Sequence, residues 1–117
     1  MRLNEIRYGS SVPIDGYGPG FFRVAGVVWR GAVLVTANGA AAWNGFGDTA
    51  PLLALRGHVD VIFIGTGAEI AYLPADLSRL LQDAGIGAEA MASATAARTY
   101  NVLLSEGRRV AAALLPV

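Results

Sequence analysis

The sequence predicts a compact α/β domain, with a β-meander in its N-terminal part and a β-α-β-α-β unit in its C-terminal part. Residues 59–116 alternate short apolar runs with segments of helical period, which indicates a strand–helix–strand–helix–strand unit with glycines at the joints. Residues 21–43 carry β-branched and aromatic residues between turn formers, which is typical of an N-terminal antiparallel β-meander. A length of 117 residues favours one domain, so we expect residues 1–117 to fold as a single unit.

The N-terminal part of the chain mixes turn formers with aromatic residues. Residues 14–20 are rich in Gly and Pro, and we expect either an ordered loop that Tyr17 pins to the core or a plain surface loop. The strands of the meander are predicted at residues 21–24, 27–29, 32–36 and 40–43. Asn38-Gly39 supplies the positive φ angles that a tight hairpin needs between the last two strands.

A loop and a short helix are expected at residues 44–58. Asp48 or Thr49 is a suitable cap, and Pro51 suits the first turn of the helix. The single histidine, His58, follows this helix. A lone histidine at such a joint is typical of a surface or hydrogen-bonded structural residue, and proton transfer in catalysis is the alternative.

The C-terminal half carries the clearest pattern. The apolar run at residues 59–64 predicts a strand covered on both faces, and residues 88–91 and 110–115 predict two more. Pro74 opens a helix that Gly85 ends, and Ser93 is expected to cap a second helix over residues 94–106. The buried stripe predicted for that second helix consists of Ala96, Ala97, Tyr100, Leu103 and Leu104. Its other face is predicted to carry Arg98, Asn101 and Ser105.

Glycines and hydroxyl residues follow two of these strands. Because a strand–helix–strand connection pairs its strands in parallel, the two carboxyl ends should meet at one edge, where open α/β sheets bind ligands. The free N–H groups at a helix start favour an anion there. We therefore predict a candidate site for an anionic ligand, the 65–98 edge, which consists of Gly65, Thr66, Gly67, Ser93, Thr95 and Arg98.

A purely structural interpretation of the same residues stays open. The glycines fit neither the GxGxxG nor the P-loop pattern, and a tight exit from the strand also explains them. Ser93 then only caps a helix, and Arg98 bonds backbone carbonyls of residues 14–18.

Composition limits the chemistry that is available. The net charge is zero, so no nucleic-acid footprint is present, and all nine basic residues are Arg, which removes Schiff-base chemistry. The chain has no Cys and one His, so thiol chemistry and a multi-histidine metal site within one chain are excluded. Its N-terminus lacks the apolar run of a signal peptide, and no apolar run is long enough to span a bilayer. We expect a cytoplasmic protein without cofactor or metal, whose low charge favours a protein partner or a homo-oligomer.

Several motifs together resemble a known family. They are Gly65-Thr66-Gly67 after an apolar strand, Pro74 at a helix start, Glu89-Ala90-Met91, the run RTYNVLLSEGRR from Arg98 to Arg109, and Ile14-Asp15-Gly16-Tyr17-Gly18 upstream. The chain resembles a small-domain family of unknown function that includes the mitochondrial NADH dehydrogenase (complex I) 1 alpha subcomplex assembly factor 3 and the adipogenesis-associated domain-containing protein. The family tends to have Asp-Thr after the Met and Cys before the Arg-Thr-Tyr-Asn run, whereas this chain has Ala92-Ser93 and Ala97.

Two functional hypotheses follow. The resemblance implies a three-layer fold with a mixed sheet and a non-enzymatic interaction protein, with a subunit of a respiratory membrane complex as the expected partner. It assigns no catalytic residue. The alternative is a small anionic-ligand-binding protein, or an unrecognised enzyme, that uses the 65–98 edge.

Overall fold

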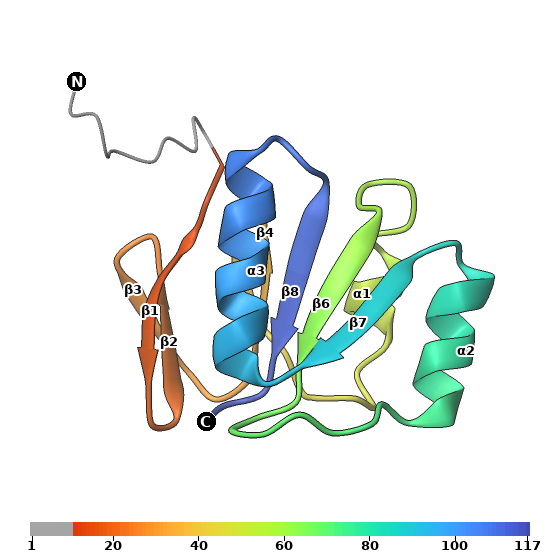
Figure 1. Cartoon of the computed structure of the whole chain (residues 1–117), viewed down its shortest axis with the longest axis horizontal. Helices are drawn as coiled ribbons and strands as arrows, with labels where there is room; N and C mark the ends of the chain where they lie inside the picture. The colour runs from red at the N-terminus through yellow and green to blue at the C-terminus, as the bar shows by residue number, and fades with distance from the viewer. Residues whose placement is uncertain (1–10) are drawn as a thin grey trace.

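Two β-sheets form the framework of the computed structural model, which describes residues 11–117 (Figure 1). The smaller sheet is antiparallel and has the order β1-β2-β3. The larger sheet is mixed and has the order β5-β4-β8-β6-β7. The strands are β1 (Ile14–Gly18), β2 (Phe21–Val24), β3 (Val27–Arg30), β4 (Val33–Thr36), β5 (Gly39–Ala42), β6 (Val61–Gly65), β7 (Gly87–Met91) and β8 (Val110–Leu114).

The last strand of the chain lies in the middle of the larger sheet. β8 pairs antiparallel with β4 and parallel with β6, and β6 pairs parallel with β7. Every residue of β8 is buried. Its small alanines alternate between the two faces, so that Ala112 packs in one core and Ala111 and Ala113 in the other.

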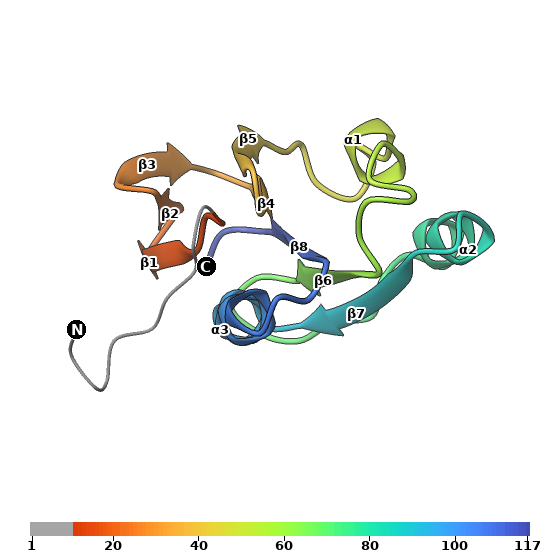
Figure 2. The same ribbon diagram turned by 90° about the horizontal axis from the view of Figure 1, so that it is seen from above.

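Helices cover both faces of the larger sheet, as Figure 2 shows from above. α3 (Ser93–Ser105) lies on one face, and α1 (Ala50–Leu53) and α2 (Ala75–Asp83) lie on the other. The core under α3 takes Ala96 and Tyr100 from the helix and Phe22 from the smaller sheet. The core under the other two helices takes Leu52 and Leu77. The predicted α/β fold with a mixed sheet and a C-terminal β-α-β-α-β unit is therefore confirmed.

The structure corrects the prediction for the N-terminal part in two ways. Residues 14–18 form strand β1, where a loop was expected. The meander also divides, because β2 and β3 join β1 while β4 and β5 join the larger sheet. The local turn propensity of this Gly-rich segment is overridden by contacts from far along the chain. The Asn101 side chain accepts a hydrogen bond from the Ile14 N–H and donates one to the Ile14 carbonyl, both at 2.8 Å.

Candidate functional site

The predicted 65–98 edge begins where β6 ends against the start of α3. Gly65 is buried there, and a Cβ atom at this position would lie 2.6 Å from Ser93 Oγ and 2.8 Å from both Ser93 Cα and a methyl carbon of Leu114. Such distances are far below a normal van der Waals contact. Only glycine therefore lets strand and helix approach so closely.

The Ser93 hydroxyl is fully buried and used within the chain. It donates to the Leu115 carbonyl at 2.6 Å and accepts from the Gly67 N–H at 2.9 Å. The Ser93 N–H in turn donates to the Gly67 carbonyl at 2.8 Å. The predicted capping role is wrong, because Ser93 is the first residue of α3 and the N-cap position is Ala92, which makes no side-chain cap bond. Ser93 instead joins three segments of the chain.

The Thr66 hydroxyl organises the loop that follows β6. Its Oγ1 lies 2.7 Å from the Glu69 carbonyl and 3.2 Å from the Met91 carbonyl, and it accepts the Ala71 N–H at 2.9 Å. Thr66 therefore fixes the path of residues 66–71 and connects it to the end of β7. Its hydrogen-bonding capacity is used for the fold.

The two remaining residues of the edge, Thr95 and Arg98, are exposed on α3. Among residues 11–117, the side chain of Arg98 makes no hydrogen bond or ion pair. The structural alternative, in which Arg98 bonds the carbonyls of residues 14–18, is wrong, since Asn101 makes that contact from the face that was expected to be exposed. The structure thus brings Gly65, Thr66, Gly67 and Ser93 together, and ligand binding at this edge stays a prediction that rests on Thr95 and Arg98.

An exposed apolar surface next to this edge was missed by the sequence reasoning. In the loop between β6 and α2, the side chain of Ile70 is 68% exposed and that of Tyr72 is 100% exposed. Beside them lies a groove of about 560 Å³. It is lined by Ile70, Ala71, Tyr72, Leu73, Ser78, Ala88 and Ala90. The available signal was apolar residues between Gly67 and Pro74, which mark the segment as a loop without a core-facing period. We call this surface the 70–90 groove.

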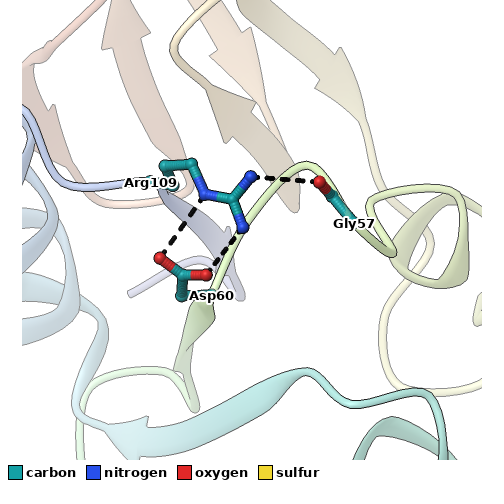
Figure 3. Close-up of polar contacts among 3 residues, drawn as sticks. All are labelled: Gly57, Asp60 and Arg109. Carbon is teal, nitrogen blue, oxygen red and sulfur yellow. Dashed lines mark hydrogen bonds and ion pairs between the residues drawn. The ribbon is translucent and has the colours of Figure 1, made fainter.

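A second polar cluster lies at the opposite end of β6 (Figure 3). Arg109 Nη2 contacts Asp60 Oδ1 at 2.8 Å, and Arg109 Nη1 donates to the Gly57 carbonyl at 3.1 Å. The hydrogen bond and charge of Arg109 hold the pKa of Asp60 below its usual range, and the same contact raises the pKa of Arg109. A cavity of about 500 Å³ next to this pair is lined by His58 and Arg108, with Leu55, Val59 and Leu104 as apolar walls. Both members of the ion pair are exposed, so solvent screens their attraction.

Within residues 11–117, no three His, Asp or Glu residues gather to hold a metal ion. In the same part of the chain, no helix has the length and apolar character needed to cross a bilayer.

Comparison with known proteins identifies the family of this chain. The model of the family described as "Protein of unknown function (DUF498/DUF598)" matches residues 14–115. The chain belongs to this family. The match spans both sheets and all three helices, so it includes the 65–98 edge and the 70–90 groove.

Relatives of this DUF498/DUF598 protein are found in bacteria and animals. An uncharacterised protein of Rhodobacter capsulatus is 56% identical over 117 residues, which cover 100% of this chain and 94% of that protein. The NADH dehydrogenase [ubiquinone] 1 alpha subcomplex assembly factor 3 of Danio rerio is 30% identical over 110 residues, which cover 88% of this chain but only 63% of that protein. This chain therefore matches a little under two thirds of the length of that assembly factor.

A solved structure confirms the fold. The crystal structure of an outer membrane protein from Bartonella henselae superposes with a TM-score of 0.84 at 36% sequence identity. The superposition covers 95% of this chain and 99% of that one.

Proposed function

We propose that this protein is a non-enzymatic interaction protein that binds a subunit of a respiratory membrane complex and assists its assembly. The observation that carries the proposal is the apolar surface at Ile70 and Tyr72, which no residue in the described range 11–117 covers. The similarity to an assembly factor of NADH dehydrogenase supports the choice of partner. The proposal places the protein in the cytoplasm, bound to the complex and not inserted in the bilayer.

The energetics of this surface favour a protein partner. Burying a large apolar side chain contributes about 1.5–3 kcal/mol, so Ile70 and Tyr72 together could supply the centre of an interface. Tyr is enriched in such centres because it offers a large apolar face and a polar tip. The loop that presents the two residues is held by the three hydrogen-bond contacts of Thr66, so little ordering is needed on binding.

The experiment is capture of partners by the tagged chain from gently solubilised bacterial membranes, analysed by mass spectrometry. We expect the wild type to recover subunits of the respiratory complex and Ile70→Asp to lose them. Val102→Asp is the matched control, because Val102 is also apolar and exposed but lies on α3. A wild type that recovers no respiratory subunit, or an Ile70→Asp variant that recovers them as well as Val102→Asp, contradicts the proposal.

The second candidate function is binding of a small anion at the 65–98 edge. Its support is the exposed guanidinium of Arg98, which is unpaired within residues 11–117 and lies one helical turn from Thr95. Citrate and inorganic phosphate are suitable probes. We expect either anion at a hundred times its dissociation constant to stabilise the wild type by about 2.7 kcal/mol, and Arg98→Ala to lose this effect. A wild type whose melting temperature neither probe raises contradicts this candidate.

A further inference from the structure

In the part of the chain that the structure describes, the larger sheet has two edge strands, β5 and β7, and β7 is the one that lines the 70–90 groove. β7 pairs with β6 on one side and is the last strand of the sheet (Figure 1). Strand edges expose a row of backbone donors and acceptors that can pair with another extended chain. The question is which groups of β7 face outward.

The hydrogen bonds at the two ends of β7 show which of its backbone groups face away from β6. The Gly87 N–H donates to the Asp60 carbonyl at 2.9 Å, and the Met91 carbonyl accepts from the Thr66 N–H at 2.8 Å. Because the residues that bond to one neighbour alternate along a strand, Gly87, Glu89 and Met91 direct their backbone groups toward β6. The N–H and C=O groups of Ala88 and Ala90 therefore point away from the sheet, at its open edge.

These same two alanines line the 70–90 groove. Their side chains form one wall, and Ile70, Tyr72 and Leu73 form another. A second hollow of about 450 Å³, which is lined by Ser78, Gln82, Gly85, Ile86, Gly87 and Ala88, shares Ser78 and Ala88 with the groove. The concave surface thus follows the length of β7, and this shape suits an extended segment.

The charge of Glu89 indicates which side chains the bound segment should carry. Successive side chains of a strand face opposite sides, so Glu89 faces the side opposite the groove, and it is exposed. A strand added beside Ala88 and Ala90 would direct alternate residues into the apolar groove. A residue between them would lie opposite Glu89, where Lys or Arg is favoured.

Charge disfavours a second copy of this chain in the antiparallel register that is centred on Glu89. Antiparallel pairing of two β7 strands with Ala88 opposite Ala90 would place the two Glu89 side chains directly opposite each other. That position is a non-hydrogen-bonded pair, in which side chains are closest, and like charges there are destabilising.

We propose that β7 binds an extended segment of a protein partner by strand addition, with apolar side chains in the 70–90 groove and a Lys or Arg opposite Glu89. This inference rests on the proposed function only in taking the partner to be a protein. It adds the part of the partner that is recognised and the backbone groups that recognise it.

A synthetic peptide tests the geometry without the natural partner. The probe is the capped peptide Lys-Val-Lys-Val-Lys-Val-Lys, followed by backbone amide hydrogen exchange in NMR. At nine-tenths saturation we expect the exchange of Ala88 and Ala90 to slow about tenfold, because only the free fraction exchanges. The amides of Glu89 and Met91, which already face β6, should not change.

Two methylated peptides serve as matched controls. One is N-methylated at every Val and the other at every inner Lys, so each lacks the donors along one edge. Only one of them should bind, and which one reports whether the added strand runs antiparallel or parallel to β7. Equal binding of both, or no protection by the parent peptide at millimolar concentration, overturns the proposal. Protection of Ala88 and Ala90 that rises with protein concentration alone, together with a dimer, overturns it in favour of a second copy.

Two variants connect the edge to partner capture. Ala90→Pro removes an outward N–H and leaves the β6–β7 ladder intact, which is where Pro is tolerated in sheets. We expect it to lose both the peptide and the respiratory subunits that the wild type captures. Capture that survives Ala90→Pro but not Ile70→Asp overturns strand addition while the proposed function stands. A wild type that binds the peptide but captures no respiratory subunit contradicts the proposed function alone.

Glu89→Lys is the second variant, because it changes no backbone group and tests the charge even if Ala90→Pro unfolds. It should weaken binding of the lysine peptide and strengthen binding of Glu-Val-Glu-Val-Glu-Val-Glu. An unchanged order of preference for the two peptides overturns the assignment of Lys or Arg opposite Glu89.

Discussion

Two neighbouring surfaces at the carboxyl ends of β6 and β7 contrast in how they use their polar and apolar groups. At the 65–98 edge, the hydroxyls of Thr66 and Ser93 are occupied by backbone groups of the same chain. At the 70–90 groove, Ile70 and Tyr72 face solvent and β7 has an open edge. The hydroxyl residues, which suggested a ligand-binding site, stabilise the fold through hydrogen bonds to the backbone. The apolar residues that remain exposed instead indicate a surface for binding another protein.

The largest expected loss of stability comes from a substitution at Gly65, where β6 packs against α3. Gly65→Ala should destabilise the protein by about 3 kcal/mol, because the new Cβ would overlap Ser93 Cα at 2.8 Å, and a backbone atom cannot move aside cheaply. Gly47→Ala is the control, since a Cβ there meets nothing within 4 Å and Gly47 has no positive φ. Urea unfolding of both variants measures the difference. Equal stability of the two variants would contradict a tight packing of the end of β6 against the start of α3.

A smaller loss is expected when the Ser93 hydroxyl is removed. Ser93→Ala leaves the buried Gly67 N–H and Leu115 carbonyl without their partner, which costs about 1–3 kcal/mol. Ser105→Ala, on the exposed end of the same helix, should stay within about 0.5 kcal/mol. If Ser93→Ala is as stable as Ser105→Ala in urea, the Ser93 hydroxyl does not stabilise the fold. That result would favour the prediction that the 65–98 edge binds a ligand.

The hydrogen bonds between Asn101 in α3 and Ile14 in β1 should contribute less to stability than the Ser93 hydroxyl does. Asn101→Ala removes two hydrogen bonds that are only partly buried, so we expect a loss of about 1–2 kcal/mol. The amide exchange of residues 14–18 should accelerate more than that of β8, because β1 depends on this contact and β8 does not. Uniform acceleration across the protein would show that the two sheets unfold together.

The smallest effect concerns acid stability at the far end of β6. The folded pKa of Asp60 lies below its ordinary value of 3.8, so its ion pair stabilises the protein above the unfolded pKa and is lost as pH falls through the folded pKa. Asp60→Asn should therefore reduce the drop in melting temperature between neutral pH and acid. An identical drop in wild type and variant would show that the exposed pair contributes nothing measurable.

Much of the fold was predictable because its signals are local. The helical period after Pro74, the positive φ of Gly85 and the buried stripe around Tyr100 all depend on residues close in sequence. β1 was not predictable, since Gly16 and Gly18 disfavour a strand and a side chain 87 residues away holds Ile14 in place. The role of Ser93 was missed for the same reason, because its partners lie in two other segments.

The measurement that tests the central claim most directly compares the two surfaces in one assay. The tagged Tyr72→Asp and Arg98→Ala variants are used to capture partners side by side with the wild type. Both side chains are exposed, so neither substitution should unfold the chain. The account predicts that Tyr72→Asp loses the respiratory subunits and Arg98→Ala keeps them. Loss with Arg98→Ala and retention with Tyr72→Asp would contradict it and place the working surface at the 65–98 edge.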